Sequence, residues 1–219
     1  MLGTGKGSAF AGIAALAFGV FTTVALVVGG APGGNYAESD VANYVAIGHL
    51  PTVIVTGYLA LVGAVGLICL LAFLRGAIST EPDRKLAADI VWGLGLASAT
   101  SFAVGWGLLT GIAVAAAEGG SSATISHPTT YALSDTILNV LYGSGGILLG
   151  FALLAVMMGS RGVLPNWLRW LTLIAGVLSV TAPFYFSAPA IPIWALVAGI
   201  WLLVAGRFPA RVAAAQRES

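Results

Sequence analysis

Charged residues are scarce in this sequence. Asp, Glu, Lys and Arg together make up 8% of the 219 residues, whereas 58% of the residues are hydrophobic. A chain with so few polar side chains cannot cover a water-soluble core of this size, which argues against a soluble globular protein. The net charge of +1 gives no support to nucleic-acid binding, because that function requires a basic patch or stripe. The composition therefore predicts a membrane protein.

Cysteine and histidine are also rare. Cys69 is the only cysteine, so the chain cannot form an intramolecular disulfide, and we interpret this residue as a small packing residue. The two histidines, His49 and His127, show no HxxxH or HExxH spacing that would place two metal ligands on one helical face. Neither histidine lies deep in an apolar stretch, as an axial haem ligand would. We therefore expect no cofactor.

Six long apolar stretches dominate the sequence. About 20 apolar residues cross a bilayer as a helix, so each stretch is predicted to span the membrane. The predicted spans are residues 8–28, 52–74, 86–116, 135–158, 167–186 and 191–205. Pro183 is expected to kink or end the fifth helix. The predicted fold is a single all-α domain of residues 1–219, a polytopic membrane bundle of six transmembrane helices.

Basic residues occur only in or beside alternate gaps between these stretches. They are Lys6, Arg75, Arg84, Lys85, Arg161, Arg169, Arg207, Arg211 and Arg217, whereas the other gaps hold Glu38, Asp40, Glu118 and Asp135. Basic residues near span ends are retained in the cytoplasm during insertion. The pattern predicts cytoplasmic termini (N-in/C-in) and places both histidines on the outer face. A cleaved signal peptide is the alternative for the first stretch, although its apolar run is longer than usual for one.

Polar residues within the spans are the best candidates for a site, because burying them in hydrocarbon is costly unless they find partners. Asp135, Asn139 and Tyr142 are spaced i, i+4, i+7, so we expect one stripe down the outer half of the fourth span. Together with Trp106 in the third span, these residues are our candidate ligand-binding residues. Ser134 or Asp135 is expected to cap the fourth span. Most other hydroxyl groups in the spans are attributed to helix packing and local hydrogen bonds.

The outer loops offer an alternative, metal-binding site. His49, His127 and Asp135 would form a His₂-carboxylate set, which binds zinc or other divalent ions, if the loops brought them together. The first outer loop also predicts a short helix, capped by Ser39 or Asp40. This helix is expected to lie at the membrane interface or to dock on the bundle.

Glycine is abundant, with 30 residues, and several glycines have the spacing of helix-packing motifs. Gly146 and Gly150 form a GxxxG pair in the fourth span, and Gly107 and Gly111 form another in the third. This spacing allows helix backbones to approach closely. Most such contacts are expected within the bundle. Some Gly-rich faces could instead join a homodimer or a partner membrane protein, in addition to the surrounding membrane lipids.

The chain resembles an uncharacterised family of bacterial six-span integral membrane proteins, a domain of unknown function. The resemblance rests on residues 41–75 and 133–180, which include an aromatic-Gly pair, a "LLG[YF]" segment and an "[FV]LP" turn. These motifs appear here as Tyr142-Gly143, Leu148-Leu149-Gly150-Phe151 and Val163-Leu164-Pro165. Family members often carry a His at the start of the fourth span, where this chain has Ser134-Asp135. The resemblance implies the fold and a bacterial cytoplasmic (inner) membrane, but no activity.

Three classes of function are compatible with these features. The first is a non-catalytic membrane protein, either an accessory subunit or a binder of a lipid or small apolar ligand in the outer half of the bundle. The second is a small transporter or permease-like unit. The third is a metal-dependent membrane hydrolase that uses the outer-face His and Asp residues. We favour the first, because no Ser or Cys has a visible base partner and no catalytic residue can be named.

Overall fold

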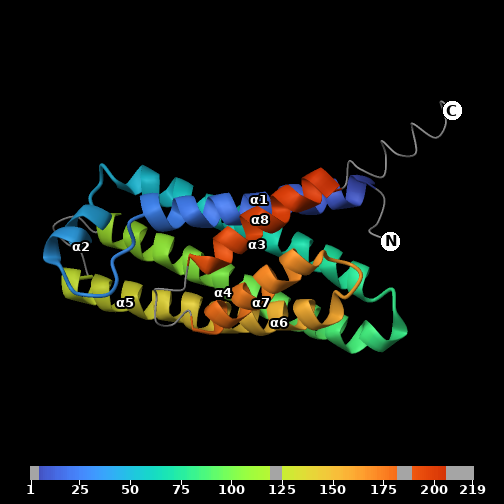
Figure 1. Cartoon of the computed structure of the whole chain (residues 1–219). Coiled ribbons are helices and arrows are strands. Elements are labelled where there is room, and N and C mark those ends of the chain that lie inside the picture. Colours follow the sequence, from blue (N-terminus) through green and yellow to red (C-terminus); the bar gives the residue numbers. More distant parts are fainter. Residues whose placement is uncertain (1–4, 119–124, 182–188, 206–219) are drawn as a thin grey trace, which may run out of the picture.

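The computed structural model describes residues 5–118, 125–181 and 189–205, and within these ranges every regular element is a helix (Figure 1). The elements are α1 (Gly5–Val28), α2 (Glu38–Tyr44), α3 (Leu50–Ile78), η1 (Pro82–Arg84), α4 (Lys85–Glu118), α5 (His127–Asn139), η3 (Val140–Gly146), α6 (Ile147–Gly159), α7 (Asn166–Val180) and α8 (Ala190–Ala205). The predicted all-α class is confirmed for the described part of the chain.

Four helical segments are long and apolar enough to cross a membrane. They are Lys6–Val28, Leu50–Ile78, Pro82–Glu118 and His127–Gly159, the last of which joins α5, η3 and α6. Their sequences are predominantly apolar, and each segment exceeds the roughly 20 residues that a bilayer crossing needs. The other two predicted spans are shorter apolar helices, α7 and α8, with 15 and 16 residues. At about 1.5 Å per residue, each is roughly 22–24 Å long.

Two helix starts differ from the sequence-based prediction. The helix that carries the fourth span begins at His127 instead of Asp135, and its N-cap is Ser126, whose side chain accepts a hydrogen bond from the Thr129 N–H. Ser134 and Asp135 therefore cap nothing, because they lie inside α5. The N-cap of α2 is Ala37, which makes no side-chain cap bond, so the predicted caps Ser39 and Asp40 were wrong as well. Pro183 and the predicted end of the fifth span lie outside the described residues.

The helices pack through small residues. α1 lies between α3 and α8, α4 packs against α3 and α6, and α6 packs against α7. A Cβ atom built on Gly66 of α3 would lie 2.5 Å from the Ala14 carbonyl oxygen of α1, and one on Gly12 would lie 2.9 Å from the Gly199 carbonyl oxygen of α8. Only glycine permits such an approach of one backbone to another.

The two predicted GxxxG pairs have different surroundings. A Cβ on Gly150 would lie 2.7 Å from the carbonyl oxygen of Gly176, across the contact between α6 and α7. By contrast, among the described residues no atom outside the adjoining backbone of α4 lies within 4 Å of a Cβ built on Gly107 or on Gly111, both of which are on the exposed face of α4. The predicted partner contact through such a face stays a prediction.

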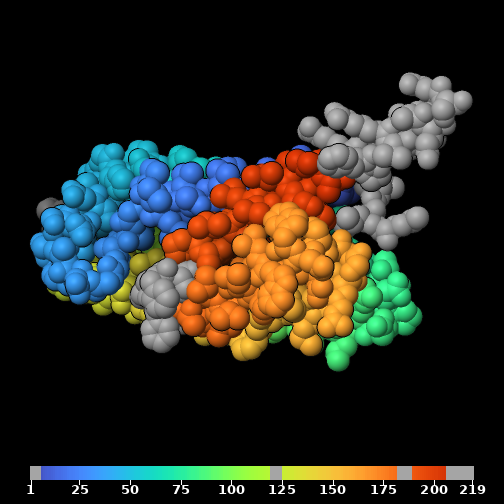
Figure 2. Space-filling view, in the orientation of Figure 1, coloured from blue at the N-terminus to red at the C-terminus, as the bar shows by residue number. Residues whose placement is uncertain are grey.

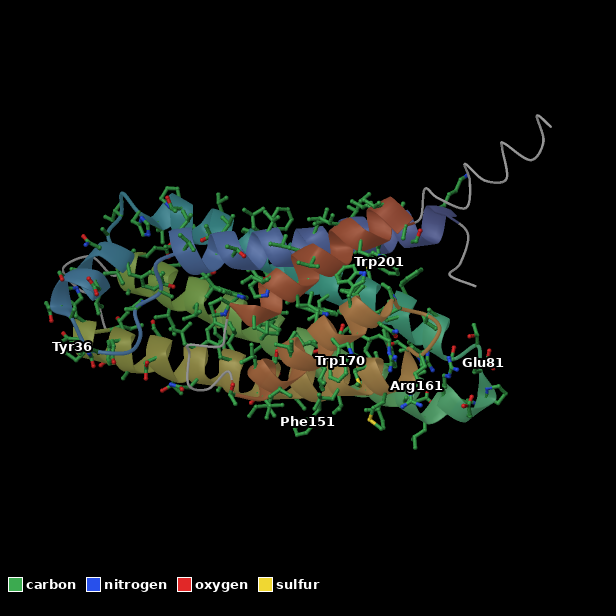
Figure 3. All side chains as sticks on the ribbon, in the orientation of Figure 1. Tyr36, Glu81, Phe151, Arg161, Trp170 and Trp201 are labelled. Atoms are coloured by element: carbon green, nitrogen blue, oxygen red, sulfur yellow. The ribbon has the colours of Figure 1, made fainter. Side chains whose placement is uncertain are left out.

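The two ends of the bundle differ in charge. At one end, Arg84 Nη1 donates a 2.6 Å hydrogen bond to the Arg161 carbonyl oxygen and so joins the α3–α4 turn to the α6–α7 turn. Arg75 pairs with Asp89 nearby, at 2.9 Å. In Figure 3, Glu81 and Arg161 lie at this end and Tyr36 lies at the opposite end. We call them the basic end and the acidic end, because among the described residues the acidic end carries Glu38, Asp40 and Asp135 and no Lys or Arg.

Candidate functional site

An apolar cavity of about 500 Å³ opens at the acidic end of the bundle. Its described lining consists of Ala25, Leu26, Ala31, Gly33, Gly34, Trp106, Leu138, Tyr142 and Pro189. These residues come from the end of α1, the segment after α1, the middle of α4, the α5–η3 region and the residue before α8. The volume lies within the range of roughly 300–1,000 Å³ that is usual for small-molecule sites.

The start of α8 lies at one border of this space. Figure 2 shows that α7 and α8 cover only part of the length of the face between α1 and α6. α8 packs along α1 from Ala190 onward, and Pro189 borders the cavity on that side. The cavity therefore lies where α8 has not yet begun and α1 has almost ended.

A segment of non-helical chain, residues 30–36, covers the cavity, and we call it the roof segment. Gly30 and Gly34 adopt positive φ angles of 64° and 79°, which glycine takes without steric cost. Gly33 lies so close to α5 that a Cβ there would be 2.6 Å from Leu138 Cδ1. The glycines of "GGAPGGNY" thus allow the chain to turn back from α1 and to lie flat on α5.

Two side chains of α5 hold the roof segment. The Gly34 N–H donates a 3.1 Å hydrogen bond to Asp135 Oδ1, and the Tyr131 hydroxyl donates to the Gly34 carbonyl oxygen. The Tyr131 ring also meets the Tyr36 ring edge-on, with centroids 5.1 Å apart. Asp135 therefore accepts a hydrogen bond that holds the roof segment on α5, and it does not itself line the cavity.

Glu38, at the start of α2, joins the same region through its carboxylate. Its Oε2 accepts a hydrogen bond from the Tyr36 hydroxyl, and its Oε1 lies 2.5 Å from His127 Nδ1 at the start of α5. The Tyr36 hydrogen bond, followed by the His127 contact, lowers the pKa of the Glu38 carboxyl below its ordinary value of 4.5. The same bond raises the pKa of the Tyr36 hydroxyl.

The Glu38 carboxylate makes the contact between α2 and α5 sensitive to low pH. Because the folded pKa of Glu38 lies below its unfolded value, its stabilising contribution is complete above about pH 4.5 and is lost as the pH falls through the lowered pKa. We expect limited proteolysis within residues 30–44 to accelerate as the pH falls below 4.5. Glu38→Gln keeps acceptor and donor atoms but does not titrate there, so its cleavage rate should change less with pH. An identical pH profile for both proteins would contradict this assignment.

The helix beneath the roof changes its winding beside the cavity. η3 is a π-helical stretch, Val140–Gly146, within the otherwise α-helical segment from His127 to Gly159. The Ser98 hydroxyl of α4 donates a 2.7 Å hydrogen bond to the Gly145 carbonyl oxygen and fixes this wider turn. Tyr142 lies in η3 and is buried against the cavity. Short π-helical stretches inside α-helices are frequent at functional sites.

Trp106 supplies the polar atom of greatest interest in the cavity wall. Its side chain is 4% exposed, and its indole Nε1–H has no hydrogen-bond acceptor in the described part of the chain. Most buried donors are paired, so an unpaired one requires an explanation. One turn further along α4, the Leu109 carbonyl oxygen accepts a 3.0 Å bond from the Tyr44 hydroxyl, which docks α2 on the bundle.

Of the four candidate ligand-binding residues, two line the cavity and two do not. Trp106 and Tyr142 line the cavity. Asp135 supports the roof segment beside it. Asn139 is exposed, and its amide donates to the Asp135 carbonyl oxygen, 2.9 Å away, instead of reaching the cavity. Leu138, the neighbour of Asn139, occupies the cavity wall in its place.

The three candidate metal ligands are not brought together. His127 contacts Glu38, and Asp135 accepts hydrogen bonds from Gly34 and Asn139. His49 is the N-cap residue of α3, with its ring beside Gly30. Over the described residues, no group of three or more His, Cys, Asp or Glu side chains is arranged to hold a metal ion.

Sequence reasoning missed the roof segment as part of the site. Its glycines indicated a turn, but nothing in the spacing of "GGAPGGNY" showed that the turn would lie over Leu138 and Tyr142. Ala25 and Leu26 were also missed, since they resemble every other apolar residue of their span.

The fold and the cavity define an all-helical membrane protein with an apolar cavity at one end of the bundle. Comparison with family models, with curated proteins and with solved structures gives no match for this chain.

Proposed function

We propose that this protein is a non-catalytic membrane protein that binds a lipid or small apolar molecule in the cavity at its acidic end. The observation that carries this proposal is the cavity itself, about 500 Å³ in volume and walled mainly by aliphatic and aromatic side chains. Ligand sites are typically apolar with a few placed polar groups, and Trp106 and Tyr142 are such groups here.

The proposed arrangement is a six-span bundle in a bacterial inner membrane, with the basic end in the cytoplasm. The separation of charge between the two ends supports this orientation, since basic residues are retained inside. α1 begins and α8 ends at the same end of the bundle in Figure 1, as an even number of spans requires. The cavity would then open towards the outer leaflet, so that a ligand enters from lipid or from the outer solution.

The arrangement of ionisable groups favours binding over the two alternative functions. A metal-dependent hydrolase would need His49, His127 and Asp135 around one ion, whereas His127 and Asp135 are engaged elsewhere. A transporter would be expected to carry ionisable residues along a path through the spans. Arg75 and Asp89 instead pair with each other near the basic end.

Filling the cavity tests the proposal. Leu138 is 7% exposed and lines the cavity, so Leu138→Trp should occupy the ligand's space. We expect the amount of apolar molecule that co-purifies, measured by mass spectrometry of solvent extracts, to fall about tenfold or more, which corresponds to roughly 1.4 kcal/mol. Leu133→Trp is the matched control, because Leu133 lies on the same helix, 42% exposed, and does not line the cavity.

Two results would overturn the proposed function. One is that the wild-type protein carries no apolar molecule and takes none up when it is offered. The other is that Leu138→Trp and Leu133→Trp retain the ligand equally while both remain folded by size-exclusion chromatography.

A further inference from the structure

We infer that the cavity selects an uncharged amphiphile that carries an acceptor oxygen, such as an ester carbonyl, and discriminates against anionic lipids. The inference rests on the proposed function and names the chemical class of its ligand. Two independent observations carry it: an unpaired hydrogen-bond donor in the cavity wall, and the distribution of charge around the cavity.

The donor is the indole N–H of Trp106. The ring forms part of the cavity wall, and the N–H is buried without an acceptor among the described residues. A buried donor without a partner is costly, and a ligand oxygen that accepts from it removes that cost. A pure hydrocarbon cannot do so. The N–H itself has almost no exposed surface, so the indole has to turn for a ligand oxygen to reach it. The favoured ligand then places one acceptor oxygen next to Trp106 and its apolar part against Ala25, Leu26 and Leu138.

The distribution of charged residues around the cavity disfavours anionic amphiphiles as ligands. No Lys or Arg occurs between Lys6 and Arg75, between Lys85 and Arg161, or between Arg169 and Arg207. All segments that line the cavity fall within these intervals, so none of them carries a Lys or Arg that could pair with a carboxylate or phosphate. Asp135 and Glu38 lie at the roof, where they would repel an anion. His127, the nearest basic group to Glu38, is already engaged with it.

A matched series of probes tests the inference, namely methyl palmitate, palmitate and hexadecane. They share one chain and differ in having an uncharged acceptor, a charged acceptor or none. With native mass spectrometry of the detergent-solubilised protein above the pKa of palmitate, we expect methyl palmitate to bind about tenfold more tightly than the other two, a difference of roughly 1.4 kcal/mol. Trp106→Phe keeps the ring but removes the donor, so methyl palmitate should then bind no better than hexadecane.

The ester carbonyl also reports the contact directly. Its infrared stretching band, isolated by ¹³C labelling, should lie at lower frequency in the wild-type complex than in the free ester. In the Trp106→Phe complex the band should lie at the frequency of the free ester. Trp92→Phe is the control, because Trp92 lies on the same helix but stacks with Arg75 near the basic end, 5.8 Å from its guanidinium carbon. This control should leave both the affinity and the band unchanged.

The outcomes separate this inference from the proposed function. Equal binding of methyl palmitate and hexadecane, unchanged in Trp106→Phe, would overturn the role of the donor while the cavity stays a binding site. Palmitate binding as tightly as its methyl ester would overturn the exclusion of anions. Binding of none of the three probes would instead contradict the proposed function.

Discussion

Replacement of Gly150 by leucine is expected to abolish the folded protein. A Cβ at this position would lie 2.7 Å from the Gly176 carbonyl oxygen and 2.8 Å from the Val180 backbone nitrogen, so α6 and α7 would have to separate. Insertion of extra atoms into a packed interior typically costs about 1–3 kcal/mol, and more where the obstacle is backbone. The measurement is the monodisperse fraction on size-exclusion chromatography after heating in detergent. Gly150→Leu should aggregate or melt far below the wild-type protein.

Gly107→Leu is the matched control for this experiment. Gly107 belongs to a pair with the same GxxxG spacing, but no described atom outside the adjoining backbone of α4 lies within 4 Å of a Cβ built there. The variant should therefore melt close to the wild-type temperature. If Gly107→Leu and Gly150→Leu were equally destabilising, or equally harmless, the assigned contact between α6 and α7 would be wrong.

Phe18→Ala is expected to cause the second largest loss of stability. Phe18 is fully buried in α1, and its ring meets that of Phe102 in α4 edge-on, with centroids 5.8 Å apart. Removing the ring leaves a cavity where α1, α3 and α4 meet, and such truncations cost about 3–5 kcal/mol. The free energy of unfolding, measured by denaturant titration in mixed micelles, should fall by about this amount.

The same helix provides a control for the loss of a phenyl ring. Phe10 is 62% exposed, so Phe10→Ala removes an identical group from the surface of α1 without opening the interior. We expect its unfolding free energy to lie within about 0.5 kcal/mol of the wild-type value. A loss in Phe10→Ala that matched the loss in Phe18→Ala would mean that α1 packs through a different face.

Much of the fold could be predicted because it depends on local patterns. Long apolar runs produce long helices, and the described helices α1, α3 and α4 begin and end within a few residues of the predicted stretches at 8–28, 52–74 and 86–116. The start of α5 was misplaced because the polar sequence "HPTTYALSD" contains no apolar run. The helix continues there because Ser126 caps it and Thr130 and Ser134 are buried within the bundle.

The candidate site could be predicted only in part, because position along a helix does not decide which neighbour a side chain meets. Asn139 has the spacing of the predicted stripe, yet it is exposed, and Leu138 lines the cavity. The unpaired state of the Trp106 N–H has no signal in the sequence at all. It depends on which groups of α1, the roof segment and η3 lie around the indole.

By itself, the sequence determined that this is an all-helical membrane protein with a basic and an acidic end. Hydrophobicity and charge act residue by residue on partition into the bilayer, so their pattern can be interpreted without knowing any contact. Only the tertiary structure decided that the acidic end contains a cavity. That cavity lies where α1 extends beyond the start of α8 at Ala190 and where the roof segment folds back onto α5. Packing between segments far apart in the chain depends on how the segments are arranged, so it cannot be deduced from the sequence of any single segment.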